Sequence, residues 1–164
     1  PLNSTVVGIS GTHINTLRST GVVAVAKADK EVTEEDVARV IEAAQAVATP
    51  PNHEILHVIP RDFTLDQQTG IKDPVGMTGV RLEVATQMII GLSAQIKNLT
   101  KCIYRTGVDI ADLVFGILAS SESTLSKKQK ELGVALVNFG AQTTSLLVYE
   151  EGDPREIGRV ARSA

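Results

Sequence analysis

Hydrophobic and polar positions along the chain predict two short strands followed by one clear helix. Apolar runs at residues 5–9 and 22–26 predict the strands, the second entered through Gly21. Thr33 is a good helix N-cap, and the three acidic residues after it favour the positive end of a helix. Apolar residues then recur at the i, i+3, i+4 spacing of one buried face until the proline pair at residues 50–51.

The stretch from residue 53 to residue 91 organises the rest of the pattern. Its two apolar runs, residues 55–65 and 80–90, are rich in β-branched side chains and predict two strands. Residues 70–79 contain three glycines and one proline, so they predict a broad loop joining two antiparallel strands. Pro60 interrupts the first run and predicts a bulge or an edge position there.

The pattern beyond residue 92 predicts a second helix and a further strand. Ser93 is the expected N-cap of a helix over residues 94–106 that ends at Gly107. The apolar run at residues 113–118 predicts a buried strand, and a short helix should follow it and reach Leu125.

The remaining segment predicts a β-hairpin followed by an irregular end. Residues 134–139 and 144–149 are two apolar runs separated by a turn-forming segment, which is the pattern of a hairpin. Residues 154–164 have weak apolar content, and we expect them to be frayed.

Composition narrows the class of protein. The 164 residues suffice for one good core, or for one small domain plus part of another. Aromatic residues make up 3% of the chain, so the core must be aliphatic. A net charge of −3 gives no basic field, and we expect no nucleic-acid partner. The single cysteine, Cys102, excludes an internal disulfide and fits a reducing cytosol; we expect it to pack beside a helical apolar stripe.

Several strings of sequence carry a family resemblance. Among them are VTEEDV at residues 32–37, LHVIP at 56–60, GIKDPVG at 70–76 and KELGV at 130–134. With shorter matches they cover residues 5 to about 149 in order. The chain therefore resembles the FtsA family, the actin-like proteins of bacterial cell division.

The resemblance implies an α/β (α+β) fold with one lobe inserted into another. A strand-helix-strand-strand-helix lobe of the SHS2 type, subdomain 1C of the family, would comprise residues 11–107. It would interrupt part of an actin-like, ribonuclease H-like lobe, subdomain 1A, comprising residues 1–10 plus 108–164. The family's first phosphate loop, second actin-like lobe and amphipathic membrane helix have no counterpart among these residues, so we interpret the chain as a fragment.

The hairpin matches the second phosphate loop of actin-like ATPases in altered form. The candidate cofactor-binding residues by this match are Asn138, Gly140, Gln142 and Thr143. Asn138 replaces a leading aspartate, and a neutral amide is the poorer magnesium ligand. Ala141 and Gln142 replace glycines that let the backbone approach phosphate. ATP and magnesium belong to the complete family, but we expect no cofactor and no enzyme activity in this chain, with the hairpin serving as structure.

The loop at residues 70–79 is the candidate partner-binding site. Asp73, Pro74, Val75, Gly76 and Met77 are the expected exposed contacts, and the alternative is a conformational loop without a partner. The resemblance implies FtsA protomers and membrane division proteins as partners. It also implies a cytoplasmic location at the inner face of the cell membrane, at the division septum. Strand edges left uncovered could support a homodimer.

Three functions therefore stay open. The favoured hypothesis is a protein-interaction fragment that acts in divisome assembly. The alternatives are a nucleotide-binding actin-like ATPase switch and another actin-like relative, such as a pilus-assembly or shape-determining protein; the string at residues 70–81 favours FtsA. We expect no metal site, because His53 and His57 share a strand face without further ligands at suitable spacing. No apolar run approaches the ~20 residues of a membrane-spanning helix.

Overall fold

The computed structural model describes residues 3–26, 29–141 and 143–161. Its residues group into two compact units. The first unit comprises Pro1–Thr16, Pro51–His57 and Ile89–Ala164, and the second comprises Leu17–Pro50 and Val58–Met88. Three of the four unit boundaries fall inside strands, and none coincides with the predicted lobe boundaries at residues 11 and 107. The division into subdomains stays a prediction.

Helix α1 (Glu34–Ala48) of the second unit begins where the sequence predicts. The Thr33 hydroxyl accepts a hydrogen bond from the Asp36 backbone N–H at 3.3 Å, and the Asp36 carboxylate accepts one from the Thr33 N–H at 3.0 Å. This reciprocal capping box satisfies two backbone donors that the first helical turn leaves free. The predicted Thr33 cap is confirmed.

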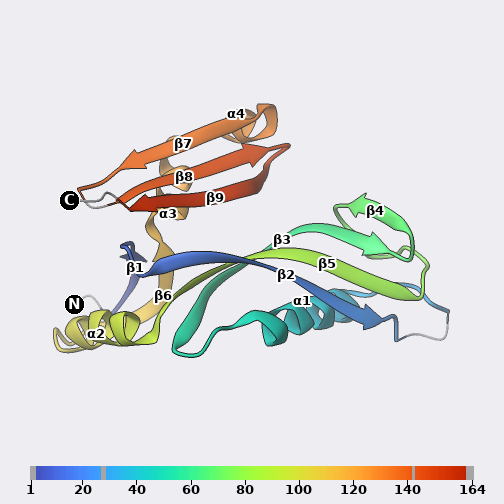
Figure 1. The fold of residues 1–164 in the computed structure, drawn as a ribbon, viewed down its shortest axis with the longest axis horizontal. Helices are drawn as coiled ribbons and strands as arrows, with labels where there is room; N and C mark the ends of the chain where they lie inside the picture. Colours follow the sequence, from blue (N-terminus) through green and yellow to red (C-terminus); the bar gives the residue numbers. More distant parts are fainter. Residues whose placement is uncertain (1–2, 27–28, 142, 162–164) are drawn as a thin grey trace. The chain divides into compact units, whose positions relative to one another are not determined.

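A four-stranded sheet has the order β2-β5-β3-β4, formed by β2 (Ile14–Ala24), β5 (Arg81–Leu92), β3 (His53–Leu65) and β4 (Gln68–Ile71). In the second unit, α1 lies along one face of these strands (Figure 1). The approach is close at Gly21, where a Cβ atom would lie 2.1 Å from the Val40 carbonyl oxygen. The core between helix and strands is aliphatic apart from one phenylalanine; it consists of Val32, Val40, Ala44, Phe63, Leu65, Ile71, Leu82 and Val84.

Two strands of this sheet differ from the sequence prediction. Strand β2 begins at Ile14 rather than at residue 22, because polar residues occupy most of residues 15–20 and leave no apolar run. Strand β4 overlaps the start of the predicted loop at residues 70–71, and only Ile71 of its four residues is buried. It pairs with β3 through Phe63 and Leu65, beyond Pro60, so Pro60 has no β4 partner in the register.

The first unit contains a parallel pair of strands, β1 (Ser4–Ile9) and β6 (Asp109–Phe115). The predicted strand at residues 113–118 is wrong in its second half, because helix α3 (Gly116–Thr124) starts at Gly116. A Cβ atom at this glycine would lie 2.3 Å from Ser10 Oγ, so a larger residue here would require the Ser10 hydroxyl to move. An apolar run cannot by itself distinguish a strand end from a helix start.

Helix α2 (Ser93–Tyr104) follows β5 directly. The predicted Ser93 cap is wrong: Leu92 occupies the N-cap position, and no side chain caps the helix. The Ser93 N–H instead donates to the Asn52 carbonyl at 2.9 Å, so backbone satisfies that donor.

The C-terminal part is a three-stranded antiparallel sheet preceded by helix α4 (Lys127–Leu132) (Figure 1). Strands β7 (Val134–Phe139) and β8 (Thr143–Glu150) form the predicted hairpin, which is confirmed. The frayed end predicted from residue 154 is wrong as far as residue 161, because β9 (Asp153–Ala161) pairs with β8 along its length. One buried side chain, Ile157, is too weak an apolar signal to reveal this strand.

Among the described residues, no helix combines the length and the apolar character that a membrane crossing requires.

Candidate functional site

The candidate partner-binding loop is fixed to the segment before α1 by main-chain hydrogen bonds. Gly76 N–H donates to the Val32 carbonyl, and Val32 N–H donates to the Met77 carbonyl, both at 2.9 Å. Gly79 N–H donates to the Lys30 carbonyl at 2.9 Å. The pairing with residues 30–32 gives the loop a fixed shape.

The tip of the loop is a tight turn with its own side-chain support. The Asp73 carboxylate accepts a hydrogen bond from the Val75 N–H at 3.1 Å, and the Met77 N–H donates to the Pro74 carbonyl at 3.1 Å. Gly76 has φ of +82°, a left-handed conformation that glycine adopts without a Cβ penalty. Aspartate and glycine thus build the turn, and Val75 stands at its tip.

Exposure divides the five predicted contact residues into two groups. Asp73, Val75 and Gly76 are exposed, with 43% of Val75 accessible. Pro74 is buried, and Met77 is half-buried against the core of the second unit, so the expectation that these two are exposed is wrong. We name the exposed set Asp73, Val75 and Gly76 the turn surface.

The altered phosphate hairpin is a tight antiparallel turn. Asn138 pairs with Ser145, and the Gly140 N–H donates to the Thr143 carbonyl at 2.9 Å. A Cβ atom at Gly140 would lie 2.9 Å from that same oxygen, so turn closure itself accounts for this glycine. Asn138 and Gly140 are exposed and Thr143 is half-buried; Gln142 lies outside the described residues.

The hairpin carries an exposed aromatic side chain that is not among its candidate cofactor-binding residues. Phe139 is 82% accessible beside Gly140, and Val137 on the same strand is 43% accessible. Strand β7 is at the edge of its sheet, next to β8 alone. Apolar side chains on an edge strand are a surface on which chains can associate.

The histidine pair has a structural explanation in the fold. His57 Nε2 accepts a hydrogen bond from the Phe115 N–H at 2.9 Å, so the ring joins β3 to the end of β6. Burial lowers the pKa of His57, although the Asp112 carboxylate opposes this, and a neutral ring is what an accepting Nε2 requires. His53 contacts the Pro51 carbonyl through Nδ1 at 3.0 Å.

Metal-binding clusters of three or more histidine, cysteine or acidic residues do not occur among the residues that the structure describes. Cys102 is exposed, so its predicted packing role is wrong. It lies on the face of α2 that also carries Gln95, Asn98 and Leu99, which together line a groove. The i, i+3, i+4 pattern does not by itself tell which stripe of a short helix is covered.

Residues 11–90 match the family described as the SHS2 domain inserted in FtsA. The cell division protein FtsA of Borreliella burgdorferi is 43% identical over 157 residues, covering 96% of this chain and 38% of that protein. The corresponding protein of Pseudomonas aeruginosa is 41% identical over 151 residues, covering 92% and 36%, and that of Bacillus subtilis is 43% identical over 152 residues, covering 93% and 34%.

A solved structure supports the fold independently of sequence. The PilM-PilN type IV pilus biogenesis complex contains a chain that superposes with a TM-score of 0.61 at 14% identity, covering 98% of this chain and 43% of that one. The predicted fold class, an α+β chain with part of an actin-like lobe, is confirmed. The chain spans a little over a third of the length of the curated relatives it matches. Over the part of those proteins that it spans, which includes the SHS2 domain, the chain belongs to the FtsA family of cell-division proteins.

Proposed function

We propose that this chain provides a protein-interaction surface of an FtsA-like cell-division protein, centred on the turn surface. The observation that carries the proposal is Val75: an accessible aliphatic side chain on a turn whose backbone is already fixed by hydrogen bonds. A contact held in place before binding loses little conformational entropy when a partner arrives. Asp73 and Gly76 shape the turn and would border the contact.

The partners that we propose are other FtsA protomers and membrane division proteins, acting in divisome assembly at the inner face of the cell membrane. What supports them is the name shared by the relatives, "cell division protein FtsA", and the family resemblance. We propose no enzymatic step, because the turn surface presents a carboxylate, an aliphatic side chain and a glycine, without a nucleophile and base in contact.

A matched pair of variants tests the turn surface. Val75→Glu places a charge at the turn, and Val137→Glu places the same charge on the edge strand β7, where the valine is also 43% accessible. Sedimentation equilibrium of the chain alone would measure self-association, and retention by an immobilised full-length FtsA relative would measure partner binding. We expect Val75→Glu to weaken binding at least tenfold, because a buried unpaired charge is costly at an interface.

The control variant distinguishes association through the turn surface from association through a strand edge. Val137→Glu should bind as the unaltered chain does. If Val137→Glu abolishes association and Val75→Glu leaves it intact, the turn proposal is wrong and the uncovered edge of β7 is the interface. Circular dichroism of both variants checks that each one folds.

A nucleotide-dependent switch is the alternative function. It would use Asn138, Gly140, Gln142 and Thr143, and would take ATP with magnesium. Its support is weaker, because turn closure already explains Gly140 and a neutral Asn138 is a poor magnesium ligand. Calorimetry with magnesium and ATP should detect no micromolar binding, and a magnesium-dependent affinity in that range would favour the switch.

A further inference from the structure

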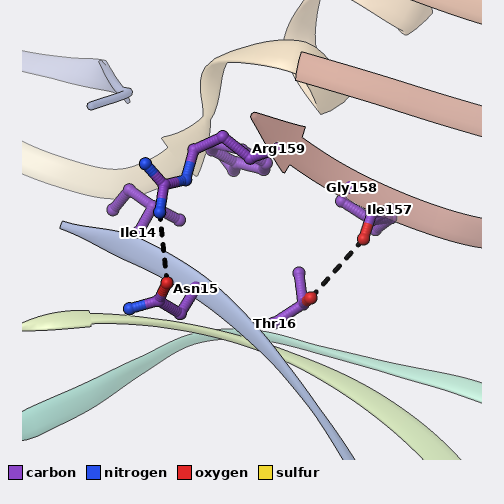
Figure 2. A pocket seen from close by; sticks show the side chains of 7 residues that line it. Ile14, Asn15, Thr16, Ile157, Gly158 and Arg159 are labelled. Carbon is purple, nitrogen blue, oxygen red and sulfur yellow. Dashed lines mark hydrogen bonds between the residues drawn. The ribbon is translucent and has the colours of Figure 1, made fainter. Parts of the chain in front are cut away.

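A cavity of about 140 Å³ lies between the start of β2 and the end of β9, both within the first unit. Its apolar wall includes Ile14, Phe115 and Ile157, and its polar side chains are Asn15, Thr16 and Arg159. Figure 2 shows two hydrogen bonds that link the strands around it. Arg159 Nη2 donates to Asn15 Oδ1 at 3.2 Å, and the Thr16 hydroxyl donates to the Ile157 carbonyl at 3.5 Å.

The guanidinium of Arg159 has more N–H donors than hydrogen-bond acceptors around it. It carries five N–H groups, and within the described residues its Nε and Nη1 atoms are buried without a hydrogen-bond partner. Arg159 as a residue is only half-buried, but buried donor atoms that lack acceptors are unfavourable, so such atoms usually have an acceptor. Because neither nitrogen is accessible to a water-sized probe, the guanidinium would have to turn toward the cavity for an acceptor there to bond them.

Among the described residues that line the cavity none is acidic, so no lining side chain in that set neutralises the charge of Arg159. Burial lowers the pKa of His13, and the nearby positive charge of Arg159 lowers it further. Arg159 therefore lacks an anionic partner among these lining residues, and two of its nitrogens lack hydrogen-bond acceptors.

We propose that this cavity binds a small oxyanion, of phosphate or carboxylate chemistry, through Arg159. The planar guanidinium matches the oxygen geometry of both groups. The apolar wall would exclude water on one side and strengthen the charge interaction. Asn15, which accepts from Arg159 at one edge, holds the guanidinium in place and acts as a positioning residue.

The size of the cavity decides against a larger ligand. Sites for cofactors and drug-sized molecules usually measure roughly 300–1,000 Å³, so about 140 Å³ suits an ion of a few atoms. None of the hairpin residues Asn138, Gly140 and Thr143 lines the cavity. The oxyanion site is thus separate from the altered phosphate hairpin and from the turn surface.

The direct test is a titration of the whole chain, observed by the backbone amide resonances. Inorganic phosphate, sodium acetate and magnesium ATP are added separately, with sodium chloride at equal ionic strength as the reference. With phosphate, acetate or both, we expect saturable shifts of the amide resonances of Asn15, Thr16 and Gly158. The dissociation constant should be roughly 1 mM. The two oxyanions distinguish phosphate from carboxylate preference.

Two arginine variants on one strand give the matched comparison. Arg159→Met keeps the aliphatic stem and removes the charge, and we expect affinity to fall at least tenfold. Arg155→Met alters the same strand, where Arg155 faces Glu150 at 3.5 Å, and should leave the oxyanion affinity within twofold. If Arg159→Met fails to fold, the localisation of the shifts in the unaltered chain decides the question.

Three outcomes would overturn the proposal. The first is that chloride produces the same shifts as the oxyanions, which would indicate charge screening alone. The second is that Arg159→Met binds as tightly as the unaltered chain. The third is that only ATP binds, with shifts confined to residues 138–145.

Discussion

Asp36 shows how a single residue links the start of a helix to the strand beside it. Its side chain is 1% accessible, and it accepts hydrogen bonds from the Thr33 N–H at 3.0 Å and hydroxyl at 2.8 Å, and from the Ala26 N–H at 3.2 Å. It also contacts Arg39. Burial raises the pKa of Asp36, but the hydrogen bonds from Thr33, Arg39 and Ala26 outweigh this and lower it to about 2.

The depressed pKa of Asp36 predicts a pH-dependent stability. A carboxyl whose pKa falls on folding stabilises the native state above its unfolded pKa, near 3.8, and loses that effect as pH falls through about 2. Asp36→Asn should therefore cost about 1–2 kcal/mol at pH 7, discounted because Arg39 is partly exposed.

Urea unfolding of both proteins between pH 7 and pH 2 measures this effect. The gap between them should narrow over the range from pH 4 to pH 2. A gap that stays constant down to pH 2 would show that the charge of Asp36 is not what stabilises the helix start.

At the scale of elements, a buried hydroxyl pair joins helix α3 to strand β8. Ser121 Oγ lies 2.7 Å from the Leu118 carbonyl and 2.9 Å from Tyr149 Oη. A serine hydroxyl has one hydrogen, and a carbonyl can only accept. Ser121 therefore donates to Leu118, and the Tyr149 hydroxyl donates to Ser121.

This donor order predicts unequal effects of removing either hydroxyl. Ser121→Ala leaves the buried Tyr149 hydroxyl without its acceptor and should cost about 2–3 kcal/mol. Tyr149→Phe leaves Ser121 bonded to Leu118 and should cost only about 1 kcal/mol. Chemical denaturation of the two single variants and the double variant measures the coupling, and the double variant should cost less than the sum. If Tyr149→Phe is the more harmful change, the donor order is reversed.

Elements with strong local signals were predictable from sequence. Helix α1 has an N-cap, acidic first-turn residues and a regular apolar stripe, and the β7–β8 hairpin has two apolar runs around a turn. The start of strand β2 and the whole of β9 lacked such signals, because edge strands expose polar side chains and bury few apolar ones. Tertiary pairing decides which strands lie at the edge of a sheet, and the local sequence pattern does not reveal that pairing.

The candidate sites, too, could be predicted only in part from the sequence. Sequence located the turn at residues 73–77 from its glycines and proline, but it could not show that Pro74 turns inward. Residues 30–32 pair with this turn although the two segments are more than 40 positions apart, so a local sequence pattern cannot predict the pairing. Arg159 looked like part of a frayed end, and only the register of β9 brings it beside Asn15.

At the scale of the whole molecule, the chain combines an SHS2 domain with further segments of an FtsA-family protein. The parallel pair β1–β6 contains only two strands among the described residues, and Val6 on β1 is 61% accessible. Parallel sheets are normally covered on both faces. Association through such edges would compete with the association that we propose for the turn surface, so an experiment on function must distinguish the two.

Hydrogen–deuterium exchange of the chain, with and without a full-length FtsA relative, tests the proposed interaction most directly. The amides of residues 73–79 should exchange more slowly in the complex, because a bound partner suppresses local opening of the turn. Peptides covering residues 138–145 and β7 should exchange at unchanged rates. Slower exchange confined to β1, β6 or β7, with no change at residues 73–79, would contradict the turn surface as the site of interaction.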